Sequence, residues 1–357
     1  MRRLCWLALL AGCHAPDAGD APAADLAVAM APDLASGGAG GAGGAGGGDG
    51  GAECALDSDG NLLDLVDAIV TTMRAGGNAG SNALTVPAAG DRDAFAARVV
   101  AILGGDEAQA CGLPASYRLV RLPTLRVVAE VDGTGTPAPS LYWGTYAAPR
   151  VKPVPSRRLA VEAPHPIFDA NTEHQAADLF LQTGAAWFLL AGAHRCADAA
   201  ASGCDGTTTA CGADANYRIS DAAHATQLPF WAVHAALSQR DGALAFLQLH
   251  GNAASCPSAL VSDSSGAWSD TGLAGQLAAA LIARGVGVGK CGAGYPTSAC
   301  NLCGTDNVEA RFTAAAADAC TQMGTSYGRF VHVEQQAGLR TMYQPLIDAA
   351  AATFPAQ

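Results

Sequence analysis

The spacing of hydrophobic and polar positions changes near the middle of the chain. In segments 61–76 and 91–105, apolar residues recur every three or four positions, which predicts two amphipathic helices. Segments 116–133 and 140–147 are rich in β-branched and aromatic residues and are separated by turn residues, which predicts strands. Up to about residue 150, the pattern therefore indicates two helices followed by a small antiparallel β-section.

From residue 157 onward, strand-like and helix-like segments alternate. Predicted strands cover 157–165, 185–195, 242–251, 258–266 and 328–336, and predicted helices cover 172–184, 223–239, 271–285 and 339–354. Thr172 and Gln175 have the spacing of a capping box at the start of the first of these helices. Parallel strands need long crossover connections, so this alternation predicts an α/β fold. We expect three layers, with a mostly parallel mixed sheet between helices on both faces.

The N-terminus has the features of an export signal. Arg2 and Arg3 precede a short apolar segment, residues 4–10, which is too short to span a bilayer. The stretch LAGC, residues 10–13, resembles the lipobox of bacterial lipoproteins. This resemblance implies that Cys13 is lipidated and anchors the protein in the bacterial cell envelope, at the outer membrane or the cell surface. The alternative is an ordinary signal peptide in which the cysteine occurs by chance.

The segment that follows the signal cannot form a hydrophobic core. Residues 14–52 are dominated by glycine and alanine, including GGAGGAGGAGGGDGG, which predicts a flexible linker. We therefore expect a signal peptide at 1–13, this linker, and a single α/β domain at 53–357. Within that domain, a helical and β part at 53–150 precedes a core of alternating strands and helices at 151–357.

The charge balance restricts the partners of the protein. The chain has 32 acidic and 20 basic residues, and its formal net charge is -12. Such an acidic chain is a poor match for nucleic acid or for anionic membrane surfaces. The sequence leaves the oligomeric state open.

Cysteine usage indicates an oxidising compartment. Besides Cys5 and Cys13 in the N-terminal signal, the chain has ten further cysteines, and an even number in an exported protein predicts disulfides. Cys204 and Cys211 are close in sequence and are the pair we expect to be bonded. The CNLC stretch could be a redox or zinc pair, but export favours structural bridging of its two cysteines.

Several predicted strands end in residues capable of chemistry. Because ligands of open α/β sheets bind beyond the carboxyl ends of strands, we expect these side chains to meet at one edge. Nitrogen and oxygen ligands with one open position are what a catalytic zinc ion requires. A lone histidine at a strand end is more often a structural residue. The interpretation as a metal site therefore depends on several predicted strands ending in such residues. The residues at these strand ends are His165, His194, Arg195, His250 and Glu334.

The carboxylate that would bind the same ion as His165 is ambiguous. Asp169 lies four residues after His165, within reach of the same ion. Glu173 falls in the first turn of the predicted helix, where a carboxylate is favourable for the helix dipole alone. We therefore favour Asp169 over Glu173 as the ligand.

Three motifs resemble the zinc carboxypeptidase superfamily when read in order: APHPIFDANTE, LQLHG and VHVEQQAGLR. Within it, the sequence is most similar to the poly-γ-glutamate hydrolase and N-formylglutamate amidohydrolase groups. The resemblance covers roughly residues 157–345 and implies a zinc exopeptidase-like fold. It also implies that His165, Asp169 and His250 bind Zn²⁺ and that Glu334 is the general base. The superfamily commonly has His-x-x-Glu at the first motif, and this chain departs from that pattern.

Other polar residues are candidates for substrate binding. Arg195 and Arg340 could each bind a substrate carboxylate, or could form structural ion pairs. His224 could stabilise an oxyanion, Asp221 is placed to cap a helix beginning at Ala222, and His234 is expected to be a packing residue.

The function that these expectations define is a cell-surface, zinc-dependent amide hydrolase of peptidase or amidohydrolase type. Its substrate would be a peptide or an N-acyl amino acid that carries a carboxylate. The alternative is a non-catalytic surface binding lipoprotein on the same scaffold.

Overall fold

A computed structural model describes residues 54–154, 156–252 and 255–357. The expected export signal with Cys13 and the linker 14–52 lie outside the described residues. None of the described helices is both long and apolar enough to cross a membrane.

The N-terminal part of the domain contains two long helices and four strands. In order, these elements are β1 (Ala55–Asp57), α1 (Leu62–Gly76), α2 (Ala89–Leu103), the 3₁₀ turn η1 (Glu107–Gly112), β2 (Tyr117–Arg121), β3 (Leu125–Glu130) and β4 (Thr145–Pro149). Helix α1 begins where the Asn61 side chain accepts a hydrogen bond from the Asp64 amide at 2.9 Å. Its apolar residues recur at helical spacing and are buried, as the sequence pattern predicts.

The remainder of the chain alternates strands and helices. Its strands are β5 (Arg157–Ala163), β6 (Ala185–Leu190), β7 (Thr207–Thr208), β8 (Ala215–Asn216), β9 (Ala245–Gly251), β10 (Ala259–Ser262), β11 (Val288–Cys291), β12 (Gly294–Tyr295) and β13 (Phe330–Gln335). Its helices are α3 (Thr172–Thr183), the 3₁₀ turn η2 (Ala222–His224), α4 (Pro229–Arg240), α5 (Leu273–Ile282), α6 (Val308–Thr313), α7 (Ala337–Thr341) and α8 (Gln344–Thr353).

Eleven strands form one sheet in the order β1-β2-β3-β4-β6-β5-β9-β13-β10-β11-β12. The central strands β6, β5, β9 and β13 are parallel to one another, whereas β2, β3 and β4 form an antiparallel extension that joins β6. Strand β10 is antiparallel to β13. The expectation of a mostly parallel mixed sheet is confirmed, and the antiparallel N-terminal strands belong to the same sheet.

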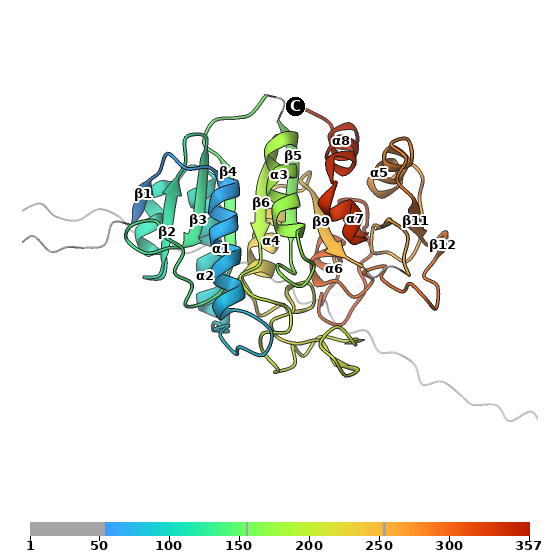
Figure 1. Cartoon of the computed structure of the whole chain (residues 1–357), viewed down its shortest axis with the longest axis horizontal. Coiled ribbons are helices and arrows are strands. Elements are labelled where there is room, and N and C mark those ends of the chain that lie inside the picture. Colours follow the sequence, from blue (N-terminus) through green and yellow to red (C-terminus); the bar gives the residue numbers. More distant parts are fainter. Residues whose placement is uncertain (1–53, 155, 253–254) are drawn as a thin grey trace, which may run out of the picture. The chain divides into compact units, whose positions relative to one another are not determined.

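Helices cover both faces of the sheet (Figure 1). Helices α1, α3, α5 and α8 pack with one large hydrophobic cluster, and α2 and α4 pack with a second cluster on the opposite face. This three-layer arrangement buries the central strands on both sides, which explains their nearly continuous apolar sequences.

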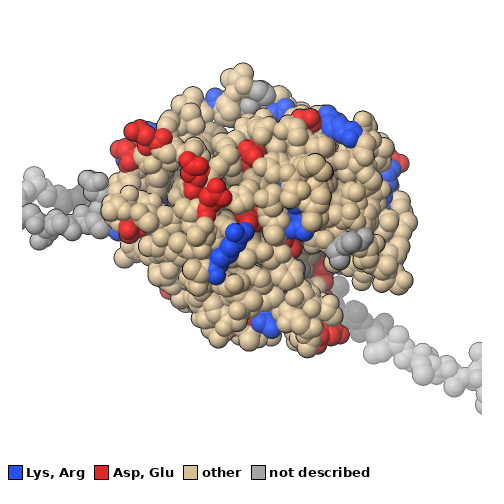
Figure 2. All heavy atoms as spheres, in the orientation of Figure 1, with Lys and Arg blue, Asp and Glu red and all other residues tan. Residues whose placement is uncertain are grey.

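Charged side chains are sparse on the surface. On the face shown in Figure 2, the Lys and Arg side chains of the described residues are scattered among uncharged residues and do not form a continuous basic patch. A group of acidic side chains on the same face agrees with the net charge of -12.

Two expected elements end or begin differently. Strand β6 stops at Leu190, so His194 and Arg195 lie in the following loop, where Gly192 packs directly against the backbone of Tyr142. The helix expected from residue 223 begins only at Pro229, because the residue before a proline is disfavoured in helical geometry.

One further helix and one helix cap differ from expectation, although α3 begins at Thr172 and ends at the C-cap Gly184 as predicted. The single helix predicted for 339–354 is divided into α7 and α8, with Pro345 in the first turn of α8. The capping box at Thr172 is not formed, because Asn171 occupies the N-cap position with a left-handed φ of 77°. The Asn171 side chain donates to the Arg340 carbonyl oxygen instead of capping the helix.

Five disulfides join the ten cysteines of the described chain. They are Cys54–Cys111, Cys196–Cys211, Cys204–Cys320, Cys256–Cys300 and Cys291–Cys303. The expected Cys204–Cys211 bond is wrong, because Cys204 packs with Val308 and Ala319 beside α6. The structural interpretation of the CNLC stretch is confirmed, since its two cysteines bond to two different partners.

The long-range disulfide gives the first testable prediction. Changing Cys204 and Cys320 together to Ser opens a link across 116 residues, whereas the Cys291–Cys303 link spans 12. In the chain-entropy description, the first double variant should therefore lose about 2 kcal/mol more unfolding free energy than the second. Urea denaturation measures both losses. Peptide mapping without reduction should recover a Cys204–Cys320 peptide, and a Cys204–Cys211 peptide would contradict the structure.

Candidate functional site

Three adjacent parallel strands carry the candidate site at their carboxyl ends. His250 is near the end of β9 and is paired in register with Glu334 of β13. His165 follows β5 by two residues, and β5 lies on the other side of β9. The sheet therefore brings these three sequence-predicted residues to one edge, where all three are buried.

Two histidines and an aspartate converge at this edge. His165 Nδ1 lies 3.1 Å from Asp169 Oδ2 and 3.2 Å from His250 Nδ1, and the remaining distance, from His250 Nδ1 to Asp169 Oδ2, is 3.7 Å. Zinc bonds of about 2.0–2.1 Å at tetrahedral angles place ligand atoms about 3.3 Å apart. The three atoms therefore have the mutual spacing of three ligands of one ion, and they form a group that could hold a metal.

The loop after β5 positions Asp169. The Asp169 amide donates to the His165 carbonyl at 3.0 Å, and the Thr172 amide donates to the Asp169 carbonyl at 3.0 Å. This tight turn directs the carboxylate of Asp169 back toward His165. Glu173 is also buried, but it belongs to α3 and its nearest basic partner is Arg74 at 3.6 Å. Of the two candidate carboxylates, only Asp169 lies with the histidines.

Each histidine is held through the ring nitrogen that faces away from the convergence point. His165 Nε2 lies 2.7 Å from Asp221 Oδ1, and His250 Nε2 lies 2.7 Å from Gln248 Oε1. Because a carboxylate or amide oxygen accepts, each Nε2 donates, and a ring that carries only this proton keeps a lone pair on Nδ1. Outer partners of this kind orient histidine ligands in metal sites.

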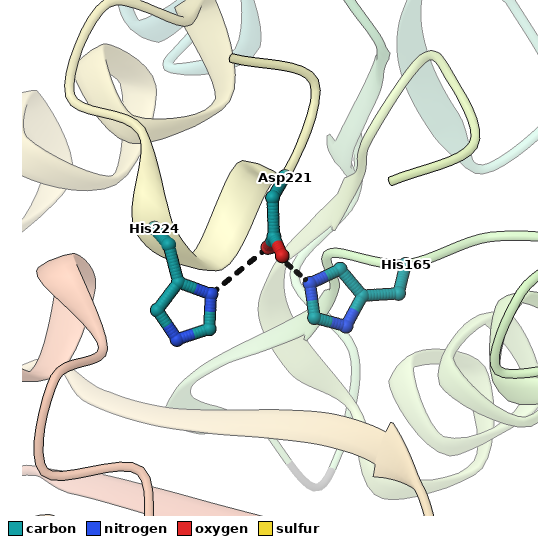
Figure 3. A group of neighbouring side chains, drawn as sticks. All are labelled: His165, Asp221 and His224. Carbon is teal, nitrogen blue, oxygen red and sulfur yellow. Dashed lines mark hydrogen bonds and ion pairs between the residues drawn. The ribbon is translucent and has the colours of Figure 1, made fainter. Parts of the chain in front are cut away.

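Asp221 does not cap a helix, contrary to expectation. Only a single 3₁₀ turn follows it, and its side chain makes no cap hydrogen bond. Figure 3 shows its carboxylate between His165 and His224, where Oδ1 accepts from His165 Nε2 at 2.7 Å and from His224 Nδ1 at 2.9 Å. Arg195 donates to the other oxygen, from Nε at 3.0 Å and from Nη2. The residue is therefore the centre of a buried hydrogen-bond network.

His165, Asp221 and His224 form a second group whose ligand atoms are close enough for one metal ion. Burial alone would raise the pKa of Asp221, but Arg195 and the two histidines hold that pKa well below its usual range. Burial alone would lower the pKa of His224, but Asp221 and Asp306 outweigh it and raise that pKa. A raised pKa favours the protonated imidazole, which has no lone pair for a metal, so in the metal-free chain these three residues have the character of a charge network.

Arg195 and Arg340 have different environments. The Arg195 guanidinium is engaged by Asp221 and lies 5.2 Å from the centre of the Phe168 ring. Arg340 donates from Nη1 to the Ala170 carbonyl at 2.6 Å, and no carboxylate of the described residues forms an ion pair with it. The two arginines are therefore not equivalent candidates for a substrate carboxylate.

His194 lies outside the convergence point. Its Nδ1 accepts a hydrogen bond from the Cys196 amide at 3.0 Å, and its ring contacts Phe168 edge-on. Burial, with a further contribution from His165, lowers the pKa of His194. This residue stabilises the turn after β6.

Glu334 lies beside the ligand group with one oxygen available. Its Oε1 is 3.2 Å from His332 Nε2, and its buried Oε2 has no hydrogen-bond partner in the described chain. Burial raises the pKa of Glu334, and His332 offsets part of this shift. Burial, followed by His332 and His165, lowers the pKa of His250 well below its ordinary value, which favours the neutral ring that a metal requires.

Sequence reasoning missed His332. The alternation in FVHVEQ places His332 and Glu334 on the same face of β13, which was the available signal. The His332 ring lies 4.3 Å from that of His250, and Gly304 packs against it. A Cβ at Gly304 would come within 2.8 Å of His332 Nδ1, so the loop there requires glycine.

A cavity of about 320 Å³ opens onto this group. Two loops supply the wall that sequence reasoning did not identify, because these loops have no regular hydrophobic period. Their side chains are mostly polar: Thr207, Thr208, Thr209, Tyr217, Asn301, Thr305 and Asp306. A larger surface groove of about 750 Å³ near α7 and α8 contains none of the candidate ligands.

Comparisons with known proteins give only distant likenesses. No family model matches the chain, and no curated protein matches it. An N-formylglutamate amidohydrolase from Ralstonia eutropha JMP134 is 15% identical with a TM-score of 0.33, over 59% of this chain and 96% of that one. A candidate metallopeptidase from Shewanella amazonensis SB2B is 12% identical with a TM-score of 0.30, over 58% and 79%.

A third solved structure has a similar score. A candidate carboxypeptidase A from Shewanella denitrificans OS-217 is 13% identical with a TM-score of 0.31, over 59% of each chain. The names of these proteins fall among the groups that the sequence motifs resemble. At these scores the matches assign neither a family nor an activity to the chain.

The choice between the two carboxylates can be tested directly. With Zn²⁺ as the probe ion, Asp169→Asn should weaken metal binding by more than about 100-fold if this group holds the metal, since loss of a ligand should exceed the roughly 10–100-fold cost of losing an outer partner. Glu173→Gln should leave zinc affinity unchanged, and it serves as the matched control. Competition with a fluorescent chelator measures both affinities. Equal zinc affinity in Asp169→Asn and the wild-type protein would exclude Asp169 as a ligand.

Proposed function

We propose that the protein is a zinc-dependent hydrolase of amide bonds. The observation that carries this proposal is the convergence of His165 Nδ1, Asp169 Oδ2 and His250 Nδ1 at separations of 3.1–3.7 Å, beside Glu334. Two nitrogens and one oxygen, with the cavity on the remaining side, are the donor set of a catalytic zinc site. The outer partners on both rings support the same assignment.

When bound, zinc supplies Lewis-acid polarisation of a carbonyl group and lowers the pKa of water. The residues of the chain would supply the proton transfer. Glu334 has an unpartnered oxygen beside the ligand group and a raised pKa, which suits a general base that accepts a proton from water and passes it to the leaving amine. His332 would hold the other oxygen of Glu334 in place.

Positive charge on the cavity wall would favour a developing oxyanion. Arg195 Nη1 lies 3.5 Å from His165 Nδ1, so the guanidinium edge is beside the ligand group. His224 lines the same cavity and carries a raised pKa, which favours its charged form. Fixed charges of this kind stabilise a transition state more than a ground state.

We propose a peptide or an N-acyl amino acid with a carboxylate as the substrate. Of the two candidate arginines, Arg340 is the one without a carboxylate partner in the described chain, and its guanidinium packs against Gly251, which lines the cavity. A planar guanidinium binds a carboxylate through two parallel hydrogen bonds. Arg195 could share this role only if its contact with Asp221 were rearranged.

The same proposal places the protein at the bacterial cell surface. The five disulfides are consistent with an extracytoplasmic compartment. Lipidation of Cys13 and a flexible spacer at 14–52 would allow the domain to act at a distance from the membrane.

Metal analysis tests the central proposal. The purified protein should bind about one zinc ion per chain, and His165→Ala and His250→Ala should abolish this binding because each removes a ligand. His174→Ala changes a partly exposed histidine of α3 and should retain zinc. A wild-type protein that binds no zinc would instead support a non-catalytic binding protein.

The general base has its own test. Glu334→Gln should retain zinc and the fold, and it should lower kcat for amide hydrolysis by about 10²–10⁴-fold, since the carboxylate that accepts the proton is lost. Steady-state kinetics on a panel of peptides and N-acyl amino acids measures the loss. Hydrolysis at the wild-type rate would exclude Glu334 as the base.

The carboxylate proposal predicts a change in specificity. Arg340→Gln should lower kcat/KM for a free-acid substrate by about 10–100-fold, in line with the loss of charged hydrogen bonds. The same variant should hydrolyse the corresponding C-terminal amide at the wild-type rate. Because Arg340 also contacts the loop of Asp169 through Ala170, zinc content is measured alongside. An equal loss for both substrates would contradict a carboxylate-binding role.

A further inference from the structure

A buried polar chain lies directly beneath the candidate metal ligand His250. Gln248 precedes it by two residues on β9, so both side chains lie on the same face of the sheet. The Gln248 amide is fully buried and uses both ends: Oε1 faces His250 Nε2 at 2.7 Å, and Nε2 donates to Glu162 Oε2 at 3.0 Å. A carboxamide can be flipped, so the direction of this amide has to be fixed by its neighbours.

The Glu162 carboxylate fixes one end of the amide. Glu162 of β5 is paired in register with Gln248, and its other oxygen accepts from His234 Nδ1 at 2.7 Å. Glu309 Oε2 lies 3.4 Å from the same Gln248 Nε2, but burial and Glu162 raise the pKa of Glu309 well above its ordinary value, so Glu309 does not fix the direction of the amide. Flipping the amide would set its oxygen against the Glu162 oxygen at hydrogen-bond distance, where neither atom has a hydrogen to donate.

Asn307 fixes the other end independently. It is the N-cap of α6, where its Oδ1 accepts from the Ala310 amide at 2.9 Å. With Oδ1 used for the cap, Nδ2 points to Gln248 Oε1 at 2.5 Å. A donor at this position requires an acceptor on Gln248. The helix cap and the Glu162 carboxylate therefore require the same orientation of the amide.

The consequence reaches the ligand atom of His250. An oxygen at 2.7 Å from His250 Nε2 requires that nitrogen to carry the proton, which leaves the lone pair on Nδ1. Nδ1 is the atom that faces His165 and Asp169. The proton position that a metal needs on His250 is thus set from outside the ligand group, by Asn307 and Gln248. In the described chain, the Asn307 side chain bonds Ala310 and Gln248 rather than a candidate ligand.

We infer that Asn307 and Gln248 are positioning residues, which hold His250 in the tautomer that presents Nδ1 to a metal. The inference rests on the proposed function for its purpose, but the tautomer itself is a property of the metal-free protein. Outer-partner changes around metal ligands typically cost about 10–100-fold in metal affinity, and this is the effect expected here.

Asn307→Asp is the sharpest variant. Aspartate retains the helix cap but replaces the Nδ2 donor with an acceptor, which opposes the orientation of Gln248. Gln248→Leu is the second variant: it removes the acceptor of His250 without adding a carboxyl group. Asn61→Asp is the matched control, because Asn61 caps α1 with the same kind of hydrogen bond and its side chain bonds Asp64 rather than the Gln248 network.

Two measurements on the full chain decide the inference. In metal-free protein labelled with ¹⁵N-histidine, NMR should show His250 protonated on Nε2 in the wild type and in Asn61→Asp, with that tautomer depleted in both site variants. Zinc affinity should fall about 10–100-fold in both site variants and remain unchanged in the control.

The possible failures are distinguishable. Protonation of His250 on Nδ1 in the wild type would overturn the inference, as would wild-type zinc affinity and an unchanged tautomer in both site variants. If the wild type binds no zinc, the proposed function fails. The NMR result then decides the tautomer inference alone: an Nε2 proton lost in both variants supports it, and any other pattern overturns it.

Discussion

The parallel register of β5, β9 and β13 is the constraint on which the candidate site depends. It places Glu334 opposite His250 at the carboxyl edge and places His332 opposite Gln248 one row below. On the other side, Glu162 is opposite Gln248. Because side chains alternate along a strand, a slip of one residue would move a whole row to the other face of the sheet. The same register therefore defines both the ligand group and the network that orients it.

Such a concentration of buried polar groups is unfavourable unless every member is compensated. Asp221 shows how this is achieved: two histidines contact one carboxylate oxygen, and Arg195 contacts the other. Removing one partner of a buried ion pair costs about 3–5 kcal/mol, because the remaining charge stays in a poor solvent. Among the buried polar atoms without a partner, two at the cavity are informative. Glu334 Oε2 and His332 Nδ1 have no partner in the described chain, and both belong to residues that line the cavity. Uncompensated polar atoms at such a position are what a reactive site requires.

The cavity wall depends on covalent links rather than on regular structure. Four of the disulfides join the segments that surround it: Cys196–Cys211, Cys204–Cys320, Cys256–Cys300 and Cys291–Cys303. The wall loops present hydroxyl and amide side chains to the cavity, and their buried contacts are built largely around the disulfide cysteines. The sheet positions the ligands, and the disulfides restrict the loops that a substrate would contact. This division explains why most of the cysteines lie in the second half of the chain.

Local patterns were sufficient for some parts of the site and not for others. The apolar runs of β5, β9 and β13 indicated where each strand ends, and the carboxyl ends of parallel strands meet at one edge of a sheet. His165, His250 and Glu334 could therefore be predicted as neighbours. The position of Asp221 could not be read this way, because it depends on how the loop after β6 folds back over the edge of the sheet. A helix-capping pattern suggested a purely local role for this residue, but besides the nearby His224 its side chain contacts His165 and Arg195, which are distant in sequence.

Asn307 shows the limit of sequence reading in another way. Its segment is rich in glycine and cysteine and reads as an irregular loop, with no periodicity to indicate which side chains point inward. A cap residue also has a sufficient local reason to exist, so nothing in the sequence suggests a second role. That role follows only when the three-dimensional arrangement places the unused end of its amide against Gln248. A residue with one satisfied local function can therefore determine the state of a ligand on a neighbouring strand.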